Sequence, residues 1–390
     1  MRRAPLADDQ IFEDGPPRRL MTLIHLSEPL LPNTTARALV VIAVGWLPLA
    51  LMVGYQALSG RPEVLASFGG DVGVHSRLLV AAPLLVIAYV ISARRLGLVA
   101  LHFLAGGVLP ATEREPFMIT LARARGLVRS LWAELVTLAL AYGLVLTTFI
   151  TDPEVLELTS WQVTAVGGRT LSPAGWWHML VSSPMLLVLI LGWFWRVAVW
   201  TWFLVKVARL DLQLVAAHPD RSGGLGFLAQ SVRAFAVVGM GMGALAAGRF
   251  ANVHLSGAAG PLTNPFLFSG TAALVLLLGV GPLLAFCPRL MSTWRSGSMA
   301  YGALAMRLGR QFEHEWLTPQ AERPMLDRPD FSATTDLYQV VGNVFAMRFV
   351  PVDLRSVAIL LAASLAPFVP AMFLSMPTSE VIAEIKGLLF

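Results

Sequence analysis

The chain has 390 residues, 56% of them hydrophobic and only 14% charged, and its mean hydropathy is +0.67. Soluble domains carry about a quarter charged residues, so this composition excludes an ordinary soluble protein and indicates a lipid-embedded one. The net charge of +5 is explained by the excess of arginine that membrane proteins carry in their cytoplasmic loops, so it does not indicate nucleic-acid binding. The single cysteine, Cys287, excludes an intramolecular disulfide and a cysteine-based metal cluster.

The N-terminal segment, residues 1–36, begins with a polar stretch of mixed charge. It lacks the apolar segment that follows the basic start of a secretory signal peptide. We therefore expect a cytoplasmic N-terminal segment, with the first transmembrane helix targeting the protein to the membrane.

Seven later stretches are apolar enough and long enough to cross a bilayer, which takes about 20 residues. Each has to be helical, because a backbone in lipid must satisfy its own hydrogen bonds. The predicted spans cover approximately residues 37–58, 77–93, 131–150, 180–204, 233–250, 267–288 and 354–376. The sequence thus predicts an all-α polytopic membrane protein. Six spans form a bundle over residues 37–288, and the last span with an outer interfacial helix covers residues 354–390.

Lysine and arginine residues set the predicted orientation. With the N-terminus inside, 23 of the 29 fall on the inner side, five fall outside, and Arg196 lies within a span. Because inner loops carry the excess of positive charge, this distribution predicts seven spans with the N-terminus inside and the C-terminus outside.

Two segments of the first inner loop need separate interpretation. Residues 96–110, LGLVALHFLAGGVLP, are apolar but too short to cross, and we expect an interfacial or re-entrant piece. Counting them as a span would move the arginine-rich residues 114–129 outside and invert every later loop. Residues 116–131 are amphipathic, which predicts a surface helix against anionic lipid headgroups on the cytoplasmic face.

The largest predicted non-membrane part is a cytoplasmic helical region over residues 289–353. Its first part is typical of a long helix that continues inward from the sixth span. One apolar stripe runs along this helix and consists of Leu304, Leu308, Phe312 and Trp316. The stretch RPMLDRPD breaks the helix, and Asp330 or Ser332 could cap a shorter helix over residues 333–349.

Two charged side chains lie inside predicted spans, Glu134 in span three and Arg196 in span four. Both fall in the inner half, and an arginine can extend its side chain along the helix toward a carboxylate at such an offset. Charges inside a membrane are costly and usually mark an ion pair or a path for an ion or solute. A structural Glu134–Arg196 pair, a substrate path and the lack of any contact are all compatible with the sequence.

The stretch HPDRSGGLGFL, residues 218–228, lies on the inner side between two strongly apolar spans. One interpretation is structural. Asp220 or Ser222 would cap a helix that begins near Gly223, and the glycines would allow a tight turn.

Two further interpretations give this loop a chemical role. Arg221, with the backbone N–H groups at Gly223 and Gly224, could bind a phosphate or another anion. Alternatively, three hard or borderline ligands could converge on a divalent metal ion. These are Asp211, His218 and Asp220.

Two stretches of the chain resemble sequences shared by a known group of proteins. One is this loop, and the other is FSATTDLYQVVGNVFAMRFVPVDLRSVAILLAASLAPFVPAMFLSMP near the C-terminus. The group consists of bacterial multi-pass inner-membrane proteins. It shares an H-P-D-x-x-G-G-L-G-F-L loop and a D-L…V…M-R-x-V-P stretch that leads into a proline-rich last span. The resemblance covers most of the second half of the chain and is weaker in the first half. It implies a bacterial inner-membrane protein of the same architecture, and it implies no activity and no cofactor.

The segment MRFVPVDL places Arg348 and Asp353 just before span seven, where they could meet the loop of residues 218–220 on the inner face. The simpler alternative is a basic interfacial anchor at Arg348 and a helix N-cap at Asp353.

Two further patterns concern helix packing. Small residues recur every four positions in span five, at Gly239, Gly243 and Ala247, which predicts close contact with a neighbouring helix. Prolines in spans two, six and seven predict kinks that free backbone carbonyls, and these are Pro83, Pro282, Pro288, Pro367 and Pro370.

Three functions are compatible with these features. The leading one is a channel or transporter for a small ion or solute, because charges and kinks lie in the spans and no soluble catalytic domain is recognisable. A scaffold or partner subunit would use residues 289–353 as its interaction surface, and a membrane enzyme or lipid-handling protein would use the loop of residues 211–228. We expect anionic lipid headgroups as partners on the cytoplasmic face and no nucleic acid, and a homo-oligomer is compatible with the sequence.

Overall fold

The computed structural model describes residues 34–151, 159–164, 170–257, 263–317 and 329–375. Within these ranges the chain is helical, and its only extended pairing is an isolated antiparallel bridge between Val163 and Leu171. The same ranges contain seven helical stretches that are long and apolar enough to cross a membrane, and each overlaps one of the seven predicted spans. The protein is therefore an all-α, multi-pass integral membrane protein, as its sequence predicts.

Most spans are built from several consecutive helical segments. Span one contains α2 (Thr34–Gly45) and α3 (Leu47–Leu58), and α4 (Glu63–Gly69) follows it. Span two contains α5 (Val72–His75), the π-helical turn η1 (Ser76–Ala81) and α6 (Ala82–Ala105). Span three contains η2 (Ala111–Glu113), α7 (Arg114–Val128) and α8 (Leu131–Thr151). Span four contains α9 (Pro173–Trp177), a second π-helical turn η3 (His178–Ser182) and α10 (Ser183–Ala208).

The remaining spans are segmented in the same way. Span five contains η4 (Gly226–Leu228), α11 (Ala229–Ala234) and α12 (Ala236–Leu255). Span six contains α13 (Thr263–Val280), the 3-10 segment η5 (Gly281–Phe286) and α14 (Cys287–Leu317), and α15 (Pro329–Phe345) follows it. Span seven contains α16 (Leu354–Leu365) and α17 (Phe368–Ser375). The α-helix is interrupted at two of the prolines predicted to form kinks, because Pro282 lies in η5 and Pro367 lies between α16 and α17.

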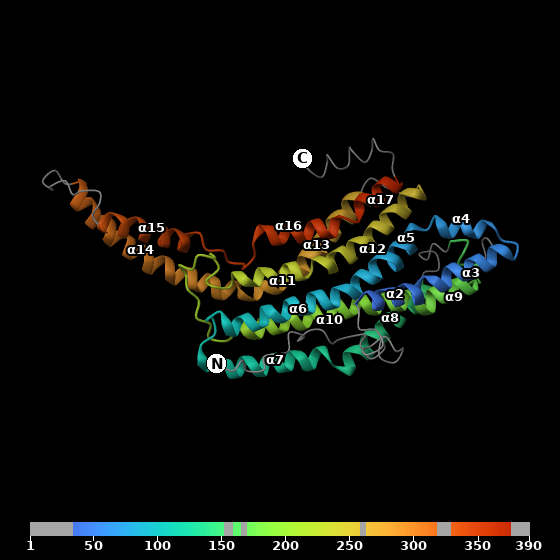
Figure 1. Cartoon of the computed structure of the whole chain (residues 1–390), viewed down its shortest axis with the longest axis horizontal. Coiled ribbons are helices and arrows are strands. Elements are labelled where there is room, and N and C mark those ends of the chain that lie inside the picture. Colours follow the sequence, from blue (N-terminus) through green and yellow to red (C-terminus); the bar gives the residue numbers. More distant parts are fainter. Residues whose placement is uncertain (1–33, 152–158, 165–169, 258–262, 318–328, 376–390) are drawn as a thin grey trace.

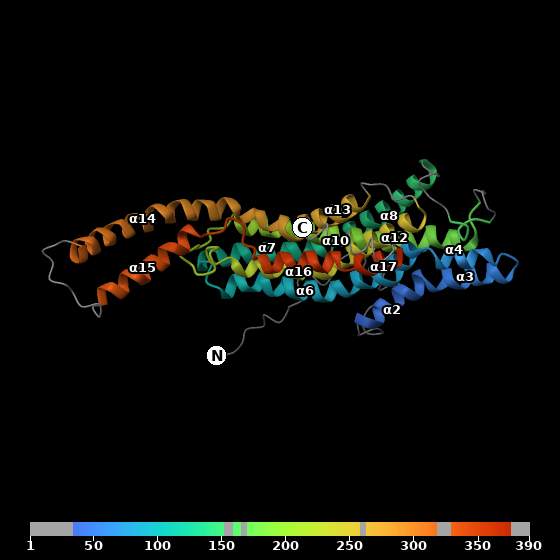
Figure 2. The ribbon, with the colours of Figure 1, turned by 90° about the horizontal axis from the view of Figure 1, so that it is seen from above.

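The long helices lie side by side along one common axis (Figures 1 and 2). At one end α14 and α15 project beyond the rest of the bundle as a helical hairpin, and this end is termed the hairpin end (Figure 1). At the other end, termed the opposite end, lie α3, α4, α5 and α9 (Figure 1). The predicted inner loops lie at the hairpin end, because Arg289 donates to the carbonyl of Ala208 and Arg348 donates from its backbone to Arg221.

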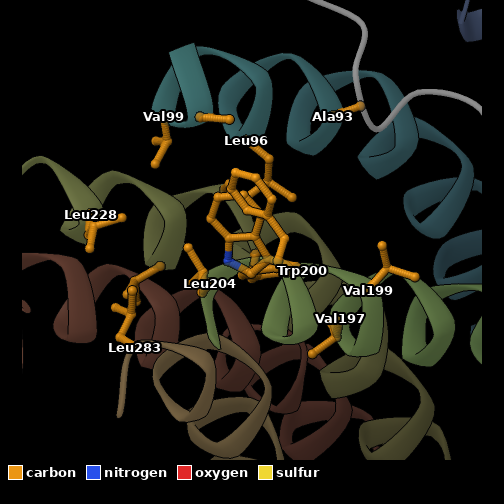
Figure 3. Packing of buried hydrophobic residues seen from close by; sticks show 14 of the residues in the cluster. Ala93, Leu96, Val99, Val197, Val199, Trp200, Leu204, Leu228 and Leu283 are labelled. Atoms are coloured by element: carbon orange, nitrogen blue, oxygen red, sulfur yellow. The ribbon is translucent and has the colours of Figure 1, made fainter. Parts of the chain in front are cut away.

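Large apolar side chains fill the bundle toward the hairpin end. Trp200 of α10 is fully buried among side chains from α6, η4, η5 and its own helix (Figure 3). These neighbours include Leu96 and Val99 of α6, Leu204 of α10, Leu228 of η4 and Leu283 of η5. Because protein interiors pack as densely as organic crystals, this half of the bundle is closed by side chains.

The small residues of span five allow α12 and α16 to approach closely, as the sequence predicts. A Cβ at Gly243 would overlap the backbone carbonyl of Ser364, and one at Gly239 would lie 3.0 Å from Val275 and 3.4 Å from Ser364. Only glycine fits at Gly243, because the clash is with backbone rather than with a flexible side chain.

The first predicted inner loop differs from expectation in its first part. Residues 96–105 are the last turns of α6, which continues unbroken to Ala105, so the interfacial or re-entrant piece expected over residues 96–110 is not formed. A turn with Gly107 at a φ of 72° follows. The predicted amphipathic helix is formed as α7, and its apolar face packs against α10. The buried residues of that face are Phe117, Leu121, Ala124 and Val128.

The long helix that was predicted to continue from span six is confirmed as α14, which packs against α15 in the hairpin. Of the predicted stripe, Leu308 and Phe312 are half-buried, Leu304 is exposed, and the side chain of Trp316 lies outside the described residues. Because α15 begins at Pro329, Asp330 and Ser332 lie inside the helix and neither caps it. Most of the N-terminal segment and the predicted outer helix after residue 375 lie outside the described residues.

Candidate functional site

Asp220 organises the loop that follows α10. One oxygen of its carboxylate, Oδ1, accepts from the backbone N–H of Ser222 at 2.8 Å and of Gly224 at 3.2 Å, and Oδ2 accepts from Gly226 at 2.8 Å. The ring of His218 approaches the same carboxylate, with Nδ1 2.8 Å from Oδ1. The carboxylate is thus enclosed by converging donors from its own loop.

The loop takes this shape because three residues adopt a left-handed backbone. Arg221, Gly223 and Gly224 have φ values of 54°, 65° and 95°. Only glycine adopts such values without cost, which explains the two glycines. The helical part begins at Gly226, so the cap predicted near Gly223 is displaced by three residues and the carboxylate of Asp220 serves the whole turn.

Burial alone would raise the pKa of Asp220. The backbone N–H groups of Ser222, Gly226 and Gly224 and the hydrogen bond from His218 outweigh burial and hold the pKa below its ordinary value. The loop therefore contains a stabilised anion of its own.

This arrangement bears on both chemical interpretations of the loop. The N–H of Gly224, which a bound phosphate would have used, is already donated to Asp220. In the described part of the chain, no group of three His, Cys, Asp or Glu side chains is placed to hold a metal ion. The metal site predicted at Asp211, His218 and Asp220 is therefore not assembled, because His218 and Asp220 pair with each other and Asp211 is exposed elsewhere in the loop. The predicted anion site at Arg221, Gly223 and Gly224 stays a prediction with fewer available donors.

The segment before span seven meets this loop through its backbone. The N–H of Arg348 donates to the carbonyl of Arg221 at 2.6 Å, while the side chain of Arg348 donates to Val352 at 3.1 Å. The expected approach of Arg348 to the loop is therefore made by main-chain atoms.

Asp353 binds a different partner from the one expected. Its carboxylate accepts from Arg233 of α11 at 2.8 Å, and the same guanidinium donates to Ser356 at 2.7 Å. Asp353 occupies the N-cap position of α16, but its side chain makes no capping hydrogen bond there. Burial would raise the pKa of Asp353, and the hydrogen bonds from Ser356 and Arg233 hold it below its ordinary value. Asp353 thus ties α16 to α11 instead of the loop.

The two predicted intramembrane charges are both buried. Arg196 of α10 is 4% exposed and Glu134 of α8 is 7% exposed, and the two helices pack against each other. The guanidinium of Arg196 lies over the ring of Tyr89, with Cζ 3.9 Å from the ring centroid, and donates to the carbonyl of Gly192 at 3.1 Å. The attraction between a cation and the face of an aromatic ring compensates part of the hydration that a buried cation loses. The ion pair between Glu134 and Arg196 stays a prediction.

A second polar site, at the opposite end, was not foreseen from the sequence. It begins with the two π-helical turns, η1 and η3, and a proline follows closely after each, Pro83 and Pro184. A proline has no N–H to donate and its ring crowds the preceding turn, so a wider π turn relieves the conflict. One carbonyl released in this way, that of Leu180, accepts from the hydroxyl of Tyr142 in α8 at 3.0 Å.

The two π turns meet at one cavity of about 240 Å³. Arg77 of η1 and His178 of η3 both line it, each six residues before its proline. Thr148 of α8, Gln162 and Ser183 of α10 supply the other polar groups. The apolar part of the lining includes Leu144, Val145, Met179 and Leu187. Isolated π turns are rare and are frequent at functional sites, so two at one cavity mark it as a candidate.

A polar cluster lies beside the cavity, around the buried carboxylate of Asp71. Oδ1 accepts from the N–H of Val74 at 3.1 Å and from the amide of Asn252 at 2.8 Å, and Oδ2 accepts from the indole of Trp161 at 3.3 Å. These bonds join α5, α12 and the segment after span three. Arg77 and His178 lie within electrostatic range of Asp71, which places one carboxylate near the cavity's cation.

The described parts of the segment after span three, residues 159–164 and 170–172, form one wall of the cavity, where Gln162 and Leu171 line it. Ser172 accepts from the N–H of Gly175 at 3.0 Å and donates to the carbonyl of Trp161 at 2.8 Å. A Cβ at Gly175 would overlap the carbonyl of Gln162, so this glycine lets the segment lie directly on α9. Arg61 holds the same segment by donating to Val163 at 2.7 Å and to Ser160 at 3.1 Å.

The sequence analysis singled out neither Arg77, the first residue of the predicted span 77–93, nor His178. A usable signal was present, because a proline follows each of them at the same spacing of six residues. This spacing indicates where the two π turns form. It does not indicate that both turns line one cavity, which depends on how spans two and four pack.

No protein-family profile, no curated protein and no solved structure matches this chain.

Proposed function

We propose that the protein is a transporter that carries a small solute through the bundle by way of the cavity at the opposite end. The observation that carries this proposal is the placement of Arg77 and His178 on two π turns that line one cavity inside membrane-spanning stretches. Charged and ionisable groups within spans are costly, and they commonly mark solute paths.

The closed half of the bundle favours a transporter over a permanently open channel. The cavity lies toward the opposite end, whereas Trp200 and its apolar neighbours fill the bundle toward the hairpin end. A binding site that is reached from one side, with a packed barrier on the other, is the arrangement that alternating access requires. Arg196 lies on α10 between the cavity residue Ser183 and Trp200, and it would be the next polar group along the path.

Flux into liposomes that contain the purified full-length protein tests this function. We expect uptake of a small solute from a panel of ions and organic solutes, reduced several-fold in Arg77→Gln and in Arg196→Leu. The exposed Arg94→Gln in the same span as Arg77 is the matched control and should transport as wild type does. If no solute of the panel enters faster than in empty liposomes, the transporter proposal is wrong.

The membrane and its orientation are also proposals. We infer that the protein lies in a bacterial inner membrane with the hairpin end in the cytoplasm, because the arginine-rich loops lie at that end and the resemblance to the inner-membrane group implies it. Exposed arginines there, such as Arg94 and Arg95, would contact anionic lipid headgroups.

A second candidate function is that of a partner subunit, and the projecting hairpin favours it. Met299, Met306 and Phe345 are 72%, 60% and 57% exposed on α14 and α15. Several exposed apolar side chains on a helical hairpin that projects from the bundle are typical of an interaction surface. The size of the particle extracted in mild detergent tests this candidate, because Met306→Glu should reduce it to a monomer if the hairpin joins copies of the chain.

A further inference from the structure

We infer that the cavity between η1, α8 and η3 binds a small organic anion, with the anionic group at Arg77 and a short hydrocarbon part against the apolar wall. Anion binding names the solute class of the transporter proposed above and to that extent rests on it. Equilibrium binding at the cavity can nevertheless be measured without transport.

Arg77 is the charged side chain that lines the cavity. Among the described residues, two charged groups act electrostatically on Arg77, the carboxylate of Asp71 and the guanidinium of Arg249. The carboxylate attracts the guanidinium of Arg77, and the guanidinium of Arg249 repels it. That carboxylate is engaged by Val74, Asn252 and Trp161, so its charge is already partly stabilised by donors other than Arg77. A bound anion would therefore be a further charge partner for Arg77.

The polar lining also presents donors. The residues that line the cavity, all in the described part of the chain, include no Asp or Glu. The Oε1 of Gln162 accepts from the N–H and the hydroxyl of Thr159, at 3.0 and 3.2 Å, which leaves the NH2 group of Gln162 to donate.

His178 adds an unsatisfied ring nitrogen. Its Nε2 lies 3.3 Å from the hydroxyl of Ser183, and its buried Nδ1 has no hydrogen-bond partner among the described residues. A buried polar atom without a partner is costly, and an anion would supply the partner if Nδ1 carries the proton.

The size and the wall of the cavity limit the ligand. About 240 Å³ is below the usual range of sites for drug-sized ligands, so the cavity suits an anion of few heavy atoms. Leu144, Val145, Met179 and Leu187 form an apolar side that would exclude water from a short hydrocarbon chain but offer nothing to a bare inorganic ion. A short-chain carboxylate meets both conditions.

Equilibrium binding of butyrate to the full-length protein in nanodiscs tests the inference. Butylamine has nearly the same shape and the opposite charge, and dodecanoate has the same headgroup on a chain too long for the cavity. We expect butyrate to bind, butylamine not to bind, and dodecanoate to bind no better than butyrate. Arg77→Gln should weaken butyrate binding about tenfold or more, because it removes a charge-assisted contact.

Two further variants keep the test decisive. Arg77→Lys retains the charge and should keep binding within about tenfold of wild type, which also covers the case in which Arg77→Gln fails to fold. Arg94→Gln is the control for changing an arginine in the same span and should bind butyrate as wild type does. Binding of butylamine, or unchanged butyrate binding in Arg77→Gln, would overturn the inference, and much tighter binding of dodecanoate would show a lipid-chain site instead.

The binding experiment tests the anion site and the flux experiment tests the transporter, so one proposal can be wrong while the other holds. Butyrate binding without flux of any solute would leave the anion site standing and remove the transporter. Flux of cations alone, with no butyrate binding, would leave the transporter standing and remove the anion site.

Discussion

Asp220 receives three backbone N–H groups and the ring of His218, and the loop after α10 depends on its negative charge. Because these contacts hold the pKa of Asp220 below its ordinary value of about 3.9, they stabilise the fold at neutral pH. This stabilisation is lost as the pH falls through the lowered pKa, when the carboxyl group is protonated.

We therefore expect Asp220→Asn to lower the unfolding free energy at neutral pH by on the order of 2 kcal/mol, the value of hydrogen bonds to a charged group. The variant should also lose less stability than wild type when the pH is lowered below about 4. Thermal unfolding in detergent as a function of pH measures both effects. The exposed Asp211→Asn is the control, and equal behaviour of the two variants would contradict the role given to Asp220.

Gly243 gives a sharper test of packing, because the same substitution can be made at a matched position. Gly243→Ala in α12 should destabilise the protein by about 1–3 kcal/mol, since its Cβ would overlap the backbone of Ser364. Gly143→Ala in α8 meets nothing within 4 Å and should be neutral or stabilising by up to about 1 kcal/mol. The melting temperature should thus fall in Gly243→Ala and not in Gly143→Ala, and an equal change in both variants would mean that α12 and α16 do not pack as described.

The π turns are the elements on which the candidate site depends. Pro83→Ala and Pro184→Ala restore an N–H, so each π turn can close into a regular α-helix with one residue less per turn. One residue corresponds to about 100° of rotation, which would turn Arg77 or His178 away from the cavity. We expect butyrate affinity to fall about tenfold in each variant while the melting temperature is kept or raised.

The control for these variants is Pro367→Ala, which alters a proline between α16 and α17 that does not line the cavity. It should bind butyrate as wild type does. Unchanged affinity in both Pro83→Ala and Pro184→Ala would show that the π turns do not position the site.

The orientation of the whole molecule can be measured with single cysteines in a Cys287→Ser background. Leu58 is 91% exposed at the end of α3, and Met306 is 60% exposed on the hairpin. With the hairpin end in the cytoplasm, a membrane-impermeant thiol reagent should label Leu58→Cys in intact cells and Met306→Cys only after permeabilisation. Labelling in the reverse pattern would invert the proposed topology.

At the same scale, the seven spans could be predicted because lipid imposes a minimum apolar length and a helical backbone on each of them. The close contact at Gly243 followed from spacing within one helix. The position at which α6 ends could not be predicted. Residues 96–105 are too few to span a membrane alone, and packing decides that they continue the preceding helix.

The candidate site shows the same limit more strongly. Asp220 could be identified as a candidate cap or metal ligand of its loop, but the sequence did not show that its carboxylate accepts from the N–H groups of Ser222, Gly224 and Gly226. Arg77 and His178 lie about 100 positions apart in the sequence, and no local pattern brings them together. Their meeting follows from the packing of spans two and four, which a single sequence does not specify residue by residue.

The loop after α10 is tied to the rest of the protein largely through main-chain atoms, and this has a consequence for how its sequence can change over generations. Val215 donates to the carbonyl of Gly223, and Arg348 donates to that of Arg221, each from a backbone N–H. Such ties survive almost any replacement of Val215, Arg221 or Arg348 other than by proline. Homologous chains should therefore vary at Val215 and Arg221 and keep the aspartate and the paired glycines, so that the shape of the loop is inherited while the side chains around it change.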